Sequence, residues 1–264
     1  VLDSTGNTLE LGDTLSIKSG GGLNFDDESG VASTSSETVS GNFGASVSSD
    51  WTPENISLVA WYDAGDASTI TSGGGGNVSK WDDKSGNDYH AERTSADGSL
   101  QPTYQASDSD ANNQPTISLS SRTGFKGLLT PSITFDSVFA ISFYKDGTVT
   151  TFELNETLLS GGGAFGTYRV QADGTGSSEF DKTGSYEFND STFKNGSTVS
   201  SVSCLPMPLT LFRFEASLSR SQITAIGYNQ ASSDRSWPGG FSELIFTNGI
   251  SAEDKTKLEG YMAH

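Results

Sequence analysis

The segment 81–90 holds the densest group of side chains that could bind a metal ion. It reads W-D-D-K-S-G-N-D-Y-H, so that Asp82, Asp83, Asn87 and Asp88 crowd one turn. Carboxylate and amide oxygens at this spacing suit Ca²⁺. The same residue types also close local turns, in which Asp and Asn side chains accept hydrogen bonds from nearby backbone N–H groups. The order of an EF-hand loop and its bidentate Glu are missing, which favours a structural turn over a calcium site.

A second candidate chemistry is carbohydrate binding, in which an aromatic ring and neighbouring Asp or Asn side chains contact a sugar. Tyr62, Tyr89 and Trp237 are the candidate platforms. Trp237 precedes Pro-Gly-Gly, a sequence typical of an exposed loop. Trp61 and Trp81 lie in strand-like contexts, so we expect them to fill the core instead.

The sequence offers no catalytic constellation. Its two histidines are His90, inside the N-D-Y-H-A turn, and His264, and neither H-E-x-x-H nor G-x-S-x-G is present. Carboxylate pairs such as Glu153 with Glu156 occur by chance among 33 acidic residues. The segment 161–166 matches G-x-G-x-x-G, but a strand-like sequence follows it where a dinucleotide site needs a helix. We therefore expect a protein that is not an enzyme.

The charge excludes two classes of partner. Fifteen Lys and Arg against 33 Asp and Glu give a net charge of −18. This field repels phosphate backbones and anionic lipids, so nucleic-acid binding is not expected. No apolar run approaches the ~18 residues that would span a bilayer, and no signal-peptide pattern opens the chain. Cys204 is the single cysteine, and its apolar neighbours predict a buried thiol.

The elements that would position these residues are mostly strands. Apolar and aromatic runs predict a strand at 58–62, a short one from 117, and a regular series separated by turns at 132–135, 138–144, 148–154, 158–160, 167–171, 185–188, 209–214, 222–228 and 241–246. Residues 91–116 are polar and turn-rich. Asp-Gly at 146–147 predicts a tight hairpin. The pattern indicates an all-β protein, an antiparallel β-sandwich or jelly roll.

One helix ends the chain. Ser251 can cap it, Asp254 falls at the capping-box position, and Leu258, Tyr261 and Met262 share one face. We expect this helix to close one edge of the sandwich.

Residues 1–50 differ from the rest and predict an extended N-terminal β arm. Leu9, Leu11, Leu15 and Ile17 alternate with polar residues before a glycine break. This spacing resembles the repeats of trimeric viral fibre shafts, which would imply three chains. Apolar residues then become sparse up to residue 49, as in a linker or an arm that is ordered against a partner. The predicted domains are therefore 1–50 and 51–264.

Three stretches carry a family resemblance. They are L-V-A-W-Y-D-A-G-D-A-S-T-I (58–70), V-S-K-W-D-D-K-S-G-N-D-Y-H-A (78–91) followed by Q-P-T-Y (101–104), and F-S-E-L-I-F-T-N-G-I-S-A-E-D-K-T-K-L-E-G-Y-M-A-H (241–264). Together they resemble the concanavalin A-like, or laminin G-like, jelly-roll domains of bacteriophage virion proteins and bacterial surface proteins. The resemblance covers residues 51–264 and leaves the arm uncovered.

The resemblance implies a structural protein on the virion surface, either a capsid decoration or head fibre or a tail fibre. The arm would attach the domain to major capsid or tail proteins, the assembly would be a homo-oligomer, and the jelly roll could adhere to host glycans. Some related domains bind calcium near a comparable loop. The alternative is a carbohydrate-binding, adhesive module of a secreted bacterial protein, and a glycan-degrading tail enzyme is a third hypothesis. A fold of this kind hosts many activities, so the motifs specify fold better than function.

Overall fold

The computed structural model describes residues 51–93, 101–119, 126–150, 156–161, 167–172, 178–181, 191–198, 205–215, 221–228 and 235–263. Residues 51–264 form one compact unit. The predicted arm 1–50, the predicted strand 185–188, Cys204, Glu153, His264 and residues 162–166 of the glycine loop lie outside the described residues.

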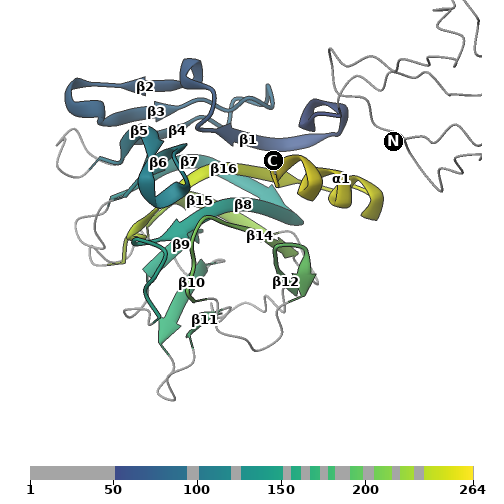
Figure 1. Ribbon diagram of the computed structural model, residues 1–264. Coiled ribbons are helices and arrows are strands. Elements are labelled where there is room, and N and C mark those ends of the chain that lie inside the picture. Colours follow the sequence, from purple (N-terminus) through teal and green to yellow (C-terminus); the bar gives the residue numbers. More distant parts are fainter. Residues whose placement is uncertain are drawn as a thin grey trace, which may run out of the picture. The chain divides into compact units, whose positions relative to one another are not determined.

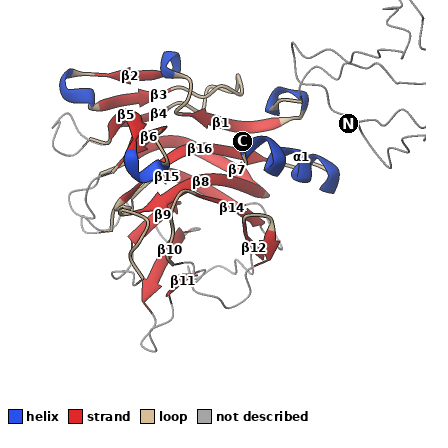
Figure 2. Cartoon of the chain, in the orientation of Figure 1, coloured by secondary structure: helices blue, strands red, loops and turns tan. Residues whose placement is uncertain are grey.

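Strands dominate this unit and form two antiparallel sheets (Figure 1, Figure 2). Sheet A has the order β13-β12-β14-β8-β16-β6-β5, and β1 also pairs with β16. Its strands are β1 (Leu58–Asp63), β5 (Thr103–Asp108), β6 (Gln114–Ser118), β8 (Ser137–Tyr144), β12 (Ser191–Lys194), β13 (Ser197–Thr198), β14 (Thr210–Glu215) and β16 (Gly239–Thr247).

Sheet B has the order β11-β10-β9-β15-β7-β4-β3-β2. Its strands are β2 (Ile70–Ser72), β3 (Val78–Trp81), β4 (Ala91–Arg93), β7 (Leu128–Phe135), β9 (Glu156–Ser160), β10 (Thr167–Ala172), β11 (Ser178–Asp181) and β15 (Ser221–Ile226). Short 3₁₀ turns occur at Pro53–Asn55, Ala67–Thr69, Gly74–Gly76 and Ser109–Ala111. The predicted all-β class with one C-terminal helix is confirmed.

Aromatic rings from both sheets meet in a shared core. Tyr62 of β1 packs on Trp81 of β3, with ring centroids 5.5 Å apart, and Phe246 of β16 packs on Phe135 of β7 at 5.1 Å. All four side chains are fully buried. Each such pair contributes about 0.5–1.5 kcal/mol beyond the burial of its area. Trp61 is also buried, so the prediction that Trp61 and Trp81 fill cores is confirmed.

The helix α1 (Ala252–Met262) begins as predicted, because the Ser251 hydroxyl accepts a hydrogen bond from the Asp254 N–H at 3.0 Å. Its apolar residues Leu258 and Met262 are buried against Trp61 and Ile245. Side chains alternate along a strand, so these residues of β1 and β16 point away from the core that Tyr62 and Leu244 enter. The helix therefore covers the outer face of sheet A, and the prediction that it closes an edge is wrong.

Two local predictions also differ from the structure. The turn at 145–147 forms, with Gly147 at φ +78° and its N–H donating to Tyr144 O at 2.9 Å. Residues 148–150 nevertheless form no strand, and β8 pairs with β14 and β16 instead. The polar region 91–116 contains β4, β5 and the start of β6. Strands form there although apolar residues are sparse, because strand formation depends on packing against neighbouring strands more than on the composition of the segment. Among the described residues, no helix is long and apolar enough to cross a bilayer.

Candidate functional site

The turn 82–89 lies along the edge of β1 that β16 leaves free. Asp83 Oδ1 accepts from the Trp61 N–H at 2.8 Å, and the Lys84 N–H donates to Trp61 O at 2.8 Å. The Asn87 side-chain amide donates to Val59 O at 3.1 Å. An unpaired strand edge exposes backbone groups that another chain can pair with. This turn satisfies them with its own backbone and side chains, which explains why the W-x-D-x-S-G-N spacing follows the L-V-A-W-Y-D strand.

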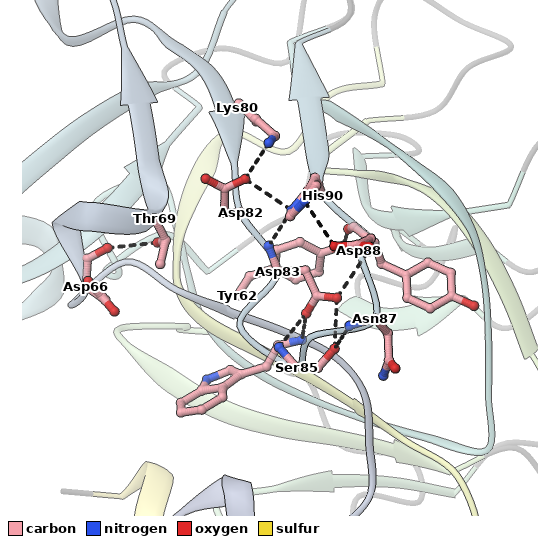
Figure 3. A network of polar contacts seen from close by, with 12 residues as sticks. Tyr62, Asp66, Thr69, Lys80, Asp82, Asp83, Ser85, Asn87, Asp88 and His90 are labelled. Atoms are coloured by element: carbon pink, nitrogen blue, oxygen red, sulfur yellow. Dashed lines mark hydrogen bonds and ion pairs between the residues drawn. The ribbon is translucent and has the colours of Figure 1, made fainter.

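The carboxylate of Asp83 is the centre of the turn (Figure 3). Besides the Trp61 N–H, it accepts from the Ser85 N–H at 2.9 Å, the Ser85 hydroxyl at 2.8 Å and the Tyr89 N–H at 3.1 Å. The side chain is 8% exposed. A carboxylate offers about four acceptor positions, and these four donors fill them. Asp83 could therefore ligate a cation only by giving up bonds that hold the turn.

The other three candidate calcium ligands make separate contacts or are exposed. Asp82 Oδ1 lies 2.6 Å from Lys80 Nζ, the Asn87 amide donates to backbone carbonyls, and the Asp88 side chain is 90% exposed. No group of three or more acidic, His or Cys side chains arranged to hold a metal occurs among the described residues. These side chains are thus not gathered as calcium ligands, and the geometry supports the structural turn that the sequence favoured.

His90 belongs to the same network. The Asp83 N–H donates to His90 Nδ1 at 3.1 Å, and His90 Nε2 faces Asp88 Oδ1 at 3.6 Å (Figure 3). The same Nδ1 lies 3.1 Å from Asp82 Oδ1. This arrangement gives His90 a role in holding the turn.

The three candidate sugar platforms differ in how far their side chains are exposed. Trp237 is 0% exposed, its indole N–H donates to Phe143 O at 3.0 Å, and its ring packs on Tyr144. The prediction of an exposed Trp237 is wrong. Tyr62 is also fully buried, and its hydroxyl donates to Tyr89 O. Burial raises the pKa of Tyr62, and the nearby Asp83 carboxylate adds to the effect. Tyr89 alone of the three has a partly exposed side chain.

A second polar cluster, which the sequence analysis missed, lies on the outer face of sheet A. Asp63 and Glu243 are directly opposite each other on β1 and β16. Such partners lie about 5 Å apart at their Cβ atoms, on one face. A bulge follows Phe241, and there the Ala64 N–H donates to Ser242 O as the chain leaves β1. To find this pair from the sequence, one would have to know the pairing register of two strands that lie about 180 residues apart.

The charges in this cluster are unevenly solvated. Lys84 Nζ lies 2.8 Å from Asp63, 3.2 Å from Asp66 and 4.3 Å from the centroid of the Trp61 ring. Burial lowers the pKa of Lys84, but hydrogen bonds and charge from the two aspartates outweigh it and raise this pKa overall. Glu243 is 8% exposed and accepts from Trp61 Nε1 at 2.7 Å. Its burial, and secondly the charge of Asp63, raise the pKa of Glu243 to about 7.

Compared with known protein families, with curated proteins and with solved structures, the chain matches none.

Proposed function

We propose that this chain is a structural protein on the surface of a bacteriophage virion. Residues 51–264 would form a concanavalin A-like jelly roll that projects outward, and residues 1–50 would anchor it to major capsid or tail proteins. The assembly would be a homo-oligomer, and the shaft-like spacing of the arm favours a trimer.

The observation that carries this proposal is that the three stretches with the family resemblance meet in one place. β1, from the first stretch, pairs with β16 from the third, and the turn 82–89 from the second closes the free edge of β1. Tyr261 of α1 then packs edge-on against Trp61, with ring centroids 6.5 Å apart. Figure 1 shows β1 beside β16 and α1, although they come from opposite ends of the described chain. Because the three motifs are far apart in the sequence and adjacent in space, they support a fold shared with the family that this chain resembles.

Deleting residues 1–49 tests the anchoring role. The remaining chain contains the whole compact unit, so we expect a folded, monomeric domain with a cooperative thermal transition. Its incorporation into phage particles should fall to the background level, as measured by immunoblot of purified particles. The full chain is the control. Particle incorporation that survives the deletion would contradict the proposal.

Adhesion to host glycans is a second element of the proposal, and Tyr89 is the residue that favours it. Its partly exposed side chain follows the exposed Asn87 and Asp88 in the chain, so this turn combines an aromatic ring with polar side chains. The burial of Trp237 and Tyr62 leaves this position as the one to test.

We expect a glycan array to show weak, saturable binding that Tyr89→Ala lowers at least about tenfold, the cost of losing roughly 1.4 kcal/mol of contact energy. Tyr104→Ala is the matched control, because Tyr104 also packs against the core with a partly exposed ring. Equal loss in both variants would place the glycan elsewhere or reflect a shared loss of stability. Micromolar binding by the isolated domain without any particle association would favour the secreted adhesive module.

A further inference from the structure

The junction at which β1, β16 and α1 meet contains a buried carboxyl group that the proposed function does not use. Glu243 leaves β16 on the outer face of sheet A, beside the bulge that follows Phe241. Its side chain is buried, and its Oε1 accepts the indole N–H of Trp61. A carboxylate buried in this way loses most of its hydration, which disfavours its charged form.

The charged and titratable groups around Glu243 come from three elements. Asp63 of β1 is its cross-strand partner and 20% exposed at its side chain. Lys84, from the turn after β3, lies against Asp63 and over the Trp61 ring. Tyr261 of α1 packs on Trp61, and burial together with the charges of Glu243, Asp63 and Glu54 raises the pKa of its hydroxyl. On its other side, Glu243 pairs with the uncharged Ile141 of β8.

Lys84 does not neutralise Glu243, because its ammonium is already held by two aspartates. It lies within 3.2 Å of both Asp63 and Asp66. The charge of Lys84 does lower the pKa of Glu243, as does the Trp61 hydrogen bond, but burial and Asp63 outweigh both. An ionised Glu243 would thus be a buried negative charge beside another negative charge.

We propose that Glu243 is a pH-sensitive latch, in which a proton on its buried carboxyl stabilises the junction of β1, β16 and α1 and loss of that proton loosens it. Loosening of this junction would also affect Trp51, the first residue of the compact unit. Tyr261 packs edge-on with both Trp61 and Trp51, with ring centroids 6.5 and 6.4 Å apart. Trp51 is the first residue after the predicted arm, so the latch would control how firmly that end of the domain is held. This inference does not depend on the virion hypothesis.

The sign of the effect follows from the pKa of Glu243, which rises from its ordinary 4.5 to about 7 in the folded protein. The folded state then binds this proton more tightly than the unfolded state. The stabilisation is fully present below pH about 4.5, falls as the pH rises, and is lost above pH about 7.

The test compares the full chain with Glu243→Gln, which resembles the protonated side chain at every pH. We expect the Tm advantage of the variant over the wild type to grow by roughly 5 °C between pH 5.5 and 8.5. Glu253→Gln is the control, because Glu253 lies on α1 with a side chain that is 76% exposed, and its Tm difference should stay constant within about 1 °C. A constant difference for Glu243→Gln would overturn the proposal.

A direct measurement remains decisive even if the variant folds poorly. The Trp61 indole N–H, assigned with Trp61→Phe, should shift in ¹H–¹⁵N spectra of the wild type with a midpoint near pH 7, since it donates to the titrating group. Asp63→Asn should move this midpoint downward by removing the neighbouring charge. A Trp61 signal that stays constant from pH 5 to 9, or a midpoint that Asp63→Asn leaves unchanged, would contradict the latch.

Discussion

Gly239→Ala should lower the free energy of unfolding by roughly 4 kcal/mol, a large part of the 5–15 kcal/mol that stabilises a typical domain. A Cβ atom on Gly239 would lie 2.0 Å from the backbone oxygen of Phe143 and 2.8 Å from Trp237 Nε1. Both neighbours are fixed, because Gly239 pairs with Tyr144 in sheet A and the indole N–H donates to Phe143 O. The strands β8 and β16 would have to separate at the point where Trp237 is buried.

Chemical denaturation measures this effect, and Gly74→Ala is its matched control. Nothing lies within 4 Å of a Cβ built on Gly74, so we expect a change within about 0.5 kcal/mol there. If Gly239→Ala were as harmless as Gly74→Ala, the segment Trp237–Gly240 would be the exposed loop that its sequence suggests, and Trp237 would return as a candidate platform.

The error over Trp237 has a physical origin that a sequence cannot show. Trp-Pro-Gly-Gly is typical of an exposed turn, since glycine permits unusual backbone angles. Here Gly239 serves close approach of two strands instead. The backbone is bonded on both sides, with Leu119 N–H donating to Gly239 O and Lys145 N–H to Pro238 O, each at 2.7 Å. Whether a glycine serves a turn or a close contact depends on its tertiary neighbours.

Features with a local cause were predicted well. The strand context of 58–62 placed Trp61 in a core, the cap at Ser251 set the start of α1, and the turn chemistry of 82–89 favoured hydrogen bonds over calcium. Tyr62, a candidate sugar platform, is instead buried. The Asp63–Glu243 pair could not be predicted, because it exists only in one register of β1 with β16, and these strands are far apart in the sequence. The prediction of a hairpin at 145–147 was wrong because strand pairing depends on distant segments: the turn forms, but β8 pairs with β14 and β16.

Asp83→Asn should destabilise the domain by roughly 2–3 kcal/mol, equivalent to about 5–10 °C in Tm. The substitution preserves the shape of the side chain but replaces one carboxylate oxygen with an amide NH₂ group, which faces N–H and O–H donors. Trp61, Ser85 and Tyr89 supply those donors. A buried donor without its acceptor costs more than the bond itself contributes. Hydrogen exchange should show loss of protection at the amides of these three residues.

Asp88→Asn makes the same chemical change at an exposed carboxylate, and we expect a change within about 0.5 kcal/mol because asparagine also tolerates its φ of +60°. Repeating both melts with excess Ca²⁺ and with a chelator separates the two interpretations of the turn. A ligand at 100 times its Kd would stabilise the folded state by about 2.7 kcal/mol. We expect no such rise, because donors within the chain already fill the acceptor positions of Asp83. A calcium-dependent rise in Tm that Asp83→Asn abolishes would show that a cation can displace those donors.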